Sequence, residues 1–209
     1  GDAINGFARI YHNGHVEKGF KPVHWCPECS SSLAEAEVEY IDKNSTAIDV
    51  KFKFDDSSND KLINKFKLDK KKNISLVIWT TTPWTIPGNQ AVCFSAEIDY
   101  QFIDSGSEYL LVAAELLEQC LDRWKDDSYE ATKIKFKGSE LEGLKSLHPL
   151  YKREAPLFLG DHVTTETGTG FVHTAPAHGV DDFNVCTSEK VEVVNPISMN
   201  NLYKDDVEF

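Results

Sequence analysis

The sequence predicts an α/β fold that is rich in β-strands. Strand patterns outnumber helix patterns, and the helix patterns lie between the strands rather than in one block. With 209 residues, 41% of them hydrophobic, the chain is long and apolar enough to bury one substantial core. No internal repeat or low-complexity segment is present. We therefore expect one main domain, with or without frayed extensions.

The first half of the chain contains two strand patterns with a helix between them. Over residues 48–54, apolar side chains alternate with charged ones, which predicts a strand with one buried and one wet face. Residues 55–59 form a turn-rich stretch that can cap a short helix ending at Leu68. The nearly continuous apolar run 74–79 predicts a strand in a sheet that is covered on both faces.

The second half continues the same alternation of elements. Residues 100–104 and 109–112 flank a Ser-Gly-Ser turn and predict a hairpin. Residues 115–124 carry an apolar stripe at i, i+4 and i+8, which predicts an amphipathic helix. Residues 133–137 alternate lysine with apolar residues, which predicts a half-buried strand whose basic row is a solvated face.

We expect residues 1–30 to form an N-terminal connector and residues 31–209 to form the main domain, cut short at its C-terminal end. Within the connector, residues 7–20 have helix-like spacing, and Pro22 then predicts an extended lead into a cysteine pair. The chain also lacks an initiator Met, which suggests a piece of something longer.

Composition and charge exclude several classes of function. The 22 Lys and Arg residues against 34 Asp and Glu give a net charge of −12, which argues against a free-standing module that grips nucleic acid through a basic surface. No apolar run approaches the roughly 20 residues that a membrane helix needs, and no signal pattern opens the chain. We therefore expect a soluble cytoplasmic protein with no membrane partner.

The five cysteines, with no secretory signal, indicate reduced thiols rather than a disulfide framework. Only Cys26 and Cys29 have the spacing of metal ligands, and they make half of a tetrahedral zinc knuckle. No second Cys-x-x-Cys or His pair follows, so we expect no closed zinc site in this chain. Either the pair is a remnant, or its partners lie beyond Phe209.

A polar loop follows the second predicted strand directly. Residues 79–89 contain four Thr, two Trp and two Pro. Because proline ends ladder pairing, the strand should open at Pro83 into a rigid, non-helical loop. Thr is a good strand residue and Trp can simply fill a core. A Thr triplet beside a Pro-Trp loop nevertheless favours a ligand site at the end of the strand.

A second polar segment covers residues 168–183. Its Gly-Thr-Gly tripeptide at 168–170 lets the backbone approach another group closely. Asp181 and Asp182 fall near the start of a predicted helix, where one carboxylate can act as a cap and the other can point elsewhere. Two His and two Asp within ten residues also fit a metal cluster, but their spacing matches no metal signature, and we do not favour that interpretation.

The chain has no Ser-His-Asp elbow, P-loop or dinucleotide fingerprint, which leaves nucleophilic catalysis and nucleoside triphosphate chemistry without support. Taken together, the segments resemble the editing domain of isoleucyl-tRNA synthetase, the connective polypeptide of that class I enzyme. The resemblance covers almost the whole chain and is carried by residues 21–26, 33–40, 79–89, 160–163 and 168–183. Trp84 is its discriminating feature, since valyl and leucyl relatives have a Thr-Thr-Arg-Pro type of loop here. Gly88 departs from the pattern, in which Ala is frequent.

The resemblance implies a β-rich α/β domain with a barrel-like sheet. It also implies an activity: hydrolysis of valine misattached to isoleucine tRNA and, in the intact ATP-binding ligase, clearance of valyl-adenylate. The partners would be the tRNA 3′ end carrying valine and the rest of the synthetase chain. The resemblance implies no cofactor in this fragment, and zinc only in the full-length parent, which would complete the Cys26 and Cys29 half-site.

The resemblance also assigns roles to residues. Asp182 would bind the α-ammonium of the amino acid, and His173 would line its side-chain cavity and help to refuse isoleucine. The catalytic set would be Thr80, Thr81, Thr82 and Asn89, and the substrate-binding set Asp182, His173, Thr85 and Trp84. An alternative from another class is a noncatalytic module that binds a free amino acid or a peptide amine.

Overall fold

The computed structural model describes residues 1–207, so the last two positions, where we expect the chain to stop within a domain, lie outside the described residues. The helices are α1 (Asp2–His12), α2 (Asp56–Phe66), α3 (Leu117–Trp124) and α4 (Val180–Ser188), with 3-10 segments η1 (Glu35–Glu37), η2 (Pro83–Gly88), η3 (Ala114–Leu116) and η4 (Gly138–Leu141). The strands are β1 (His24–Cys26), β2 (Ser31–Leu33), β3 (Ile48–Lys53), β4 (Asn73–Thr80), β5 (Ala91–Phe94), β6 (Asp99–Asp104), β7 (Glu108–Ala113), β8 (Glu130–Lys137), β9 (Lys145–Leu147), β10 (Glu154–Leu159) and β11 (Val172–Thr174). Across residues 1–207, no helix combines the length and apolar character that a bilayer crossing requires.

The larger sheet has five strands in the order β3-β4-β7-β6-β8. β3 pairs antiparallel with β4, and β4 pairs parallel with β7. β6 and β7 form the predicted hairpin, and β8 pairs along the other edge of β6. Residues 74–78 of β4 are buried without interruption, which confirms the prediction of a strand covered on both faces.

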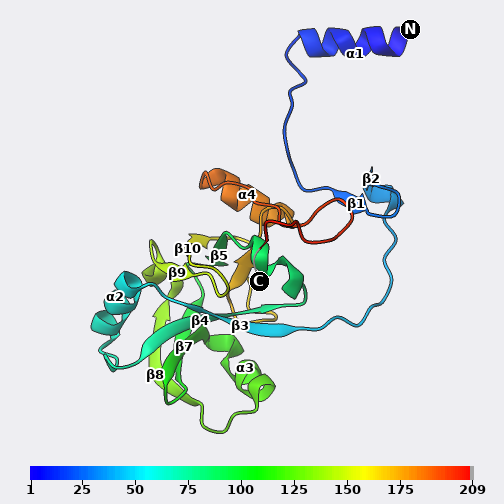
Figure 1. Ribbon diagram of the computed structural model, residues 1–209. Helices are drawn as coiled ribbons and strands as arrows, with labels where there is room; N and C mark the ends of the chain where they lie inside the picture. The colour runs from blue at the N-terminus through cyan, green and yellow to red at the C-terminus, as the bar shows by residue number, and fades with distance from the viewer. Residues whose placement is uncertain (208–209) are drawn as a thin grey trace.

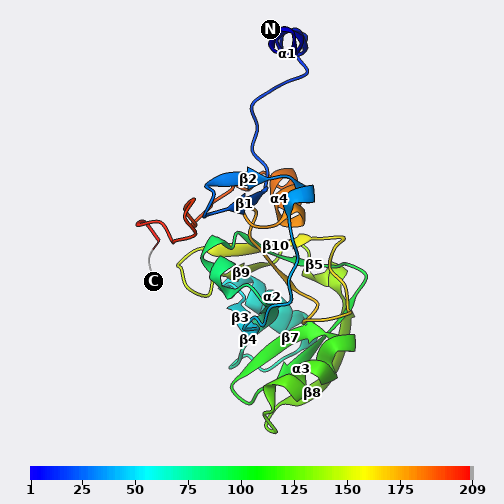
Figure 2. The ribbon, with the colours of Figure 1, turned by 90° about the vertical axis from the view of Figure 1, so that its right-hand side faces the viewer.

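The smaller sheet has four strands in the order β11-β5-β10-β9, with β5 and β10 parallel. Figures 1 and 2 show it between the larger sheet and the end of the molecule that carries α4 and the β1–β2 hairpin. A single bridge between Phe54 and Ser146 connects the two sheets at one edge. The predicted β-rich α/β class is confirmed. Nine of the described strands form the two connected sheets, which do not close into a barrel, and β1 and β2 form a separate two-stranded sheet.

One hydrophobic cluster lies between the sheets and unites them. Phe52 and Leu76 reach it from the larger sheet, and Phe94 reaches it from the smaller one. Phe102 packs against Phe66 of α2, with ring centroids 5.5 Å apart. Because each fully buried side chain of this size contributes about 1.5–3 kcal/mol, this shared core fixes how the sheets, and the loops at their ends, lie relative to each other.

The turn-rich stretch before α2 caps that helix, as predicted. The carboxylate of Asp55 accepts the backbone N–H of Ser58 at 2.9 Å, which satisfies a donor that the first helical turn leaves free. Lys67 ends the helix in the left-handed conformation. The buried Asn59 accepts the N–H of Ile74 at 2.8 Å and so attaches α2 to the start of β4.

The predicted helix over residues 7–20 is wrong in its bounds, because α1 covers Asp2–His12 and the chain turns at Gly14, where φ is +76°. No residue of α1 is buried, and Figures 1 and 2 show it standing apart from the body. The helix-like spacing therefore reflects an apolar face that packs on nothing among the described residues. The extended lead beyond it, by contrast, is found as predicted.

Candidate functional site

A cavity of about 250 Å³ opens where β4 ends. Its walls come from the end of β4 with η2, from β11, and from the turn and helix α4 that follow β11. These are the two polar segments that the sequence analysis singled out, brought together by the pairing of β11 with β5 and by the position of β4 beside them. Six of the predicted site residues line this cavity: Thr80, Thr82, Trp84, Thr85, His173 and Asp182.

The segment after β4 forms the 3-10 helix η2, so the prediction of a non-helical loop is wrong. Pro83 takes the first helical position, where the missing N–H would have had no partner anyway. Just before it, the hydroxyl oxygen of Thr80 accepts the N–H of Thr82 at 3.0 Å and lies 3.2 Å from the Thr82 hydroxyl oxygen. The strand therefore ends in a pair of adjacent hydroxyls on the cavity wall.

His173 lies in β11 with both ring nitrogens occupied. The side-chain N–H of Asn89 meets Nδ1 at 2.8 Å, and the hydroxyl of Thr85 lies 2.8 Å from Nε2. Because Asn89 donates to Nδ1, the ring proton sits on Nε2 and is donated to Thr85, whose own proton goes to the Thr82 carbonyl at 2.9 Å. Burial lowers the pKa of His173 to about 4, so the imidazole is a neutral, fixed wall.

Asp182 stands in the first turn of α4, and its carboxylate turns back into the cavity rather than capping the helix. Its Oδ2 accepts the N–H of Ala175 at 2.8 Å. A Cβ at Gly179 would lie 3.0 Å from the carboxyl carbon, so any larger residue there would push the carboxylate from this position. Burial raises the pKa of the Asp182 carboxyl, while the Ala175 N–H and the nearby His162 act in the opposite direction.

Two members of the predicted set lie elsewhere. Thr81 is exposed and lies outside the cavity lining. Asn89 is fully buried and meets the cavity only through its contact with His173. Four lining residues were not among the predicted ones, Trp79, Val172, Ala175 and His178. Of these, only His178 has a titratable side chain, and its ring packs edge-on against Trp84 with centroids 5.3 Å apart. His178 belongs to the second polar segment. The sequence signal for it is the presence of two histidines in that segment, which the sequence analysis considered only as metal ligands.

The Gly-Thr-Gly tripeptide allows the close backbone approach that was predicted. Gly168 and Gly170 have φ values of +90° and +81°. A Cβ at Gly170 would lie 2.3 Å from the Cβ of Ala113, and the neighbouring Thr169 carbonyl accepts the Ala113 N–H at 2.7 Å. The tripeptide therefore attaches the start of β11 to the end of β7 and fixes the wall that carries His173.

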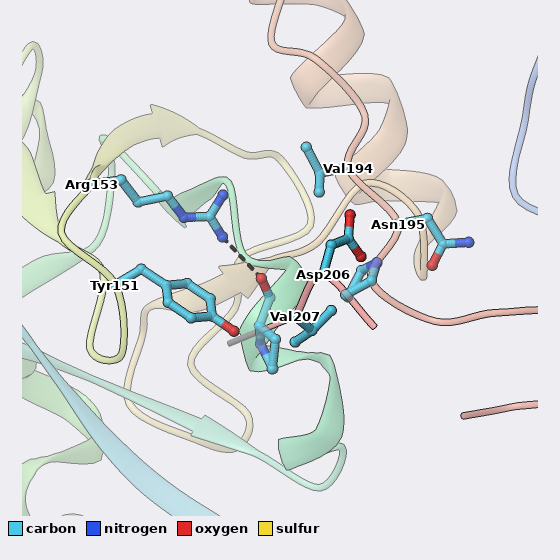
Figure 3. A pocket seen from close by; sticks show the side chains of 8 residues that line it. Tyr151, Arg153, Val194, Asn195, Asp206 and Val207 are labelled. Carbon is cyan, nitrogen blue, oxygen red and sulfur yellow. Dashed lines mark hydrogen bonds between the residues drawn. The ribbon is translucent and has the colours of Figure 1, made fainter. Parts of the chain in front are cut away.

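A second cavity, of about 270 Å³, lies beside η2 and is drawn in Figure 3. Here the guanidinium of Arg153 donates to the carbonyl of Pro87 at 2.9 Å. Burial lowers the pKa of Arg153, and its ring contact with Tyr151 places the guanidinium 5.4 Å from the ring centre. His148 supports the same segment, since its Nε2 donates to the Ile86 carbonyl at 2.9 Å. Both side chains hold η2 in place from behind the first cavity.

The cysteine pair lies in the β1–β2 hairpin, away from the cavity. The N–H of Cys29 donates to the sulfur of Cys26 at 3.3 Å, and this bond lowers the pKa of the Cys26 thiol. Among residues 1–207, no group of three or more His, Cys, Asp or Glu side chains is placed to hold a metal ion. The donor chemistry suits zinc, but this chain supplies two of the four ligands that a structural site needs.

Comparison with known proteins identifies the family. Residues 45–208 match the family model described as the editing domain of leucyl-tRNA synthetase. The isoleucine–tRNA ligase of Idiomarina loihiensis is 47% identical over 216 residues, which cover 98% of this chain and 22% of that protein. The isoleucine–tRNA ligase of Legionella pneumophila (strain Paris) is 49% identical over 206 residues, again 98% of this chain and 22% of that protein. The chain thus spans about a fifth of the length of the curated relatives it matches.

Solved structures agree at the level of the fold. The crystal structure of GlLeuRS-CP1 has a TM-score of 0.58 and 16% identity, and the match covers 71% of this chain and 66% of that one. The P. knowlesi cytosolic leucyl-tRNA synthetase editing domain has a TM-score of 0.56 and 15% identity, with 69% and 62% covered. The predicted resemblance to a synthetase editing domain is confirmed, and the chain belongs to the family of leucyl-tRNA synthetase editing domains.

Proposed function

We propose that this chain is the hydrolytic editing domain of an isoleucyl-tRNA synthetase and that it removes valine misattached to isoleucine tRNA. The observation that carries the proposal is a single cavity in which the half-buried carboxylate of Asp182 and the paired hydroxyls of Thr80 and Thr82 lie together. The relatives that are 47–49% identical are isoleucine–tRNA ligases, which supports the choice of amino acid and tRNA.

Asp182 would anchor the α-ammonium of the amino acid. One oxygen of its carboxylate is held by the Ala175 N–H, and no described group bonds to the other. A charge-assisted hydrogen bond in a partly dry site is short and directional. It would therefore fix the α-carbon and leave the side chain only one direction in which to point.

The hydroxyls of Thr80 and Thr82 would lie around the ester. They can orient a water molecule and donate to the oxygen that becomes negative in the transition state. Thr81 belongs to the catalytic set that the resemblance implies, and its exposed position fits contact with the tRNA end rather than with the amino acid. Asn89 would act as a positioning residue through His173.

His173 would set the size limit of the cavity. Its ring cannot rotate without breaking hydrogen bonds to Thr85 and Asn89, so the wall is rigid. As for synthetases in general, one methylene is worth only ~1–3 kcal/mol in a hydrophobic pocket, so a second site that accepts valine and refuses isoleucine is needed to remove the error. A rigid wall serves that purpose because it does not yield to the larger side chain.

The partners in this proposal are the valine-bearing 3′ end of isoleucine tRNA and the remainder of the ATP-binding synthetase, in which the same cavity would also clear valyl-adenylate. With a net charge of −12, this chain by itself would bind tRNA weakly, so the remainder of the synthetase would have to supply the basic surface. Protein synthesis takes place in the cytoplasm, which is where the proposal places the protein.

The proposed reaction needs no metal ion. Hydroxyls and a carboxylate supply orientation and charge, and the Cys26–Cys29 pair would take up zinc only with ligands from the full-length parent. Cys26 and Cys29 would then supply two of the zinc ligands, and the metal would have a structural role distinct from the cavity.

A deacylation assay tests the proposal. The full-length synthetase that contains this chain is mixed with valyl-tRNA or isoleucyl-tRNA, with and without a chelator, and the release of each amino acid is followed. We expect valine to be released faster than isoleucine and the chelator to leave both rates unchanged. Equal rates would contradict the size limit. Binding of a nonhydrolysable valyl-adenosine analogue without release of valine would instead support the noncatalytic amine-binding module.

A further inference from the structure

Two histidines line the cavity, and they differ in what their ring nitrogens contact. His173 uses both nitrogens, one on Asn89 and one on Thr85. Its Nδ1 lone pair is taken by the amide proton of Asn89, and its single proton is donated to Thr85. His173 therefore has nothing left with which to accept a proton from a substrate or a water molecule.

The ring of His178 makes no hydrogen bond to any group in the part of the chain that the structure describes. Its Nε2 is fully enclosed and has no partner. The ring is held by packing instead, edge-on against Trp84. Buried polar groups are almost always paired, because leaving one unpaired costs about 1–3 kcal/mol. Because Nε2 is enclosed, the ring nitrogen that a molecule in the cavity could meet is Nδ1, and no described group forms a hydrogen bond with it either.

The backbone around His178 fixes its position relative to Asp182. The N–H of His178 donates to the Ala175 carbonyl at 2.9 Å, and the N–H of Ala175 donates to Asp182 at 2.8 Å. The backbone N–H and C=O of one residue, Ala175, therefore hold both Asp182 and the backbone of His178. Burial lowers the pKa of His178, so at neutral pH the ring is uncharged and carries one free lone pair.

We propose that His178 accepts the proton of the water that attacks the ester, an inference that rests on the proposed editing function. The water oxygen bonds to the carbonyl carbon as its proton passes to the imidazole. The bond from that carbon to the ribose oxygen then breaks, and the ribose oxygen takes the proton back from the imidazolium. One water and one ester give one amino acid and one free ribose hydroxyl, and His178 ends unchanged.

The pH dependence of the single-turnover rate tests this role, provided that the other charged and titratable groups around His178 are taken into account. Asp182 faces it from α4 and His173 from β11, while Lys21, His24 and Glu35 line the groove on the other side of its ring. A proton acceptor must be neutral, and burial lowers the pKa of His178, so the single-turnover rate should fall only at pH values below 6.5, the ordinary histidine pKa. Protonation of Asp182 would weaken substrate binding instead, and saturating enzyme separates that effect from the chemical step.

The experiment compares His178→Phe and His178→Gln in the full-length synthetase with the parent and with His15→Gln. His15 is an exposed histidine of the N-terminal connector, so it provides the matched control. Phe keeps a flat ring against Trp84, and Gln keeps hydrogen bonding without a basic nitrogen. We expect both His178 variants to release valine about 100-fold more slowly in a single turnover. They should lose the acidic limb of the profile and bind a nonhydrolysable valyl-adenosine analogue within threefold of the parent.

Retention of the parent rate and its acidic limb in either variant that still binds the analogue would overturn the role of His178. If Phe at this position prevents folding, as a lost cooperative thermal transition would show, the Gln variant decides the matter alone. Failure of the parent itself to release valine would refute the proposed editing function, which is a separate result from any change confined to the His178 variants.

Discussion

Asp182 divides its carboxylate between the protein and the cavity, and this makes its substitution informative. In Asp182→Asn the side-chain carbonyl can still accept the Ala175 N–H, so the turn should keep its shape while the negative charge is lost. A truncated charge pair of this kind costs about 2–5 kcal/mol. We expect kcat/KM for valine release to fall roughly 100-fold, which corresponds to about 3 kcal/mol.

The neighbouring Asp181 provides the control for that measurement. It is exposed on α4 and outside the cavity lining, so Asp181→Asn should leave valine release within about twofold of the parent. Equal rates for the Asp182 and Asp181 variants would show that the ammonium is not held by Asp182.

His173 should control which amino acids are accepted. His173→Ala removes the ring that closes the cavity and leaves Thr85 and Asn89 without their partner. We expect isoleucyl-tRNA to become a substrate, with the ratio of isoleucine to valine release rising about 10-fold or more, as the loss of a one-methylene discrimination of ~1–3 kcal/mol implies. The two deacylation rates give that ratio directly, and an unchanged ratio would place the size limit elsewhere.

At the scale of elements, η2 depends on side chains that reach it from behind. Arg153→Met keeps an apolar stem but removes the bond to the Pro87 carbonyl and the contact with Tyr151. We expect the free energy of unfolding to fall by about 1.5–3 kcal/mol, the net contribution of a hydrogen bond from a charged group. Valine release should slow as well, because Thr85 lies in η2. Urea titration measures the first effect. The exposed neighbour Lys152 provides the control. Lys152→Met should change the free energy of unfolding by less than about 0.5 kcal/mol.

An element can be predicted from the sequence when the interactions that stabilise it are local. The β3 and β4 patterns and the Asp55 cap are local, and their predictions are confirmed. The predicted bounds of the first helix, residues 7–20, are wrong because an apolar stripe does not show where a helix ends. The chain leaves the helix before Gly14, which has a positive φ. The 3-10 form of η2 depends on Arg153 and His148, which are more than 60 residues away in sequence and leave no local signal.

The site shows the same division. Residues from the two polar segments meet in one cavity, so the sequence motifs correctly predicted which segments form the site. That Thr81 turns outward, that Asn89 sits behind His173, and that His178 is unpaired are results of tertiary packing. Spacing along the chain does not contain this information, because the three residues lie in connecting segments whose conformation depends on contacts with distant parts of the chain.

At the scale of the whole molecule, buried histidines should make stability depend on pH. Burial lowers the pKa of His148 and of His173 from 6.5 to about 4. In the unfolded chain these rings take up protons as pH falls through 6.5, whereas in the folded protein they stay neutral until about pH 4. Their contribution is therefore complete above pH 6.5 and is lost progressively between the two values.

At about 1.4 kcal/mol per pH unit, each histidine should cost about 2 kcal/mol of stability by pH 5. The raised pKa of Asp182 offsets part of this loss, because a carboxyl that protonates more readily when folded gains stability as pH falls. Urea titrations at pH 7.5 and pH 5 should show a lower midpoint at pH 5. An equal or higher midpoint at pH 5 would contradict the expected balance.

The indole N–H of Trp25 donates to the carbonyl of Met199 at 2.7 Å, although 174 residues separate them. This bond joins the β1–β2 hairpin to the segment that follows α4. The segment after α4 is attached to the cavity wall in turn, because the Tyr203 hydroxyl donates to the Trp84 carbonyl at 2.9 Å. A displacement of the hairpin would therefore be passed along this segment to Trp84, beside the site that holds Asp182.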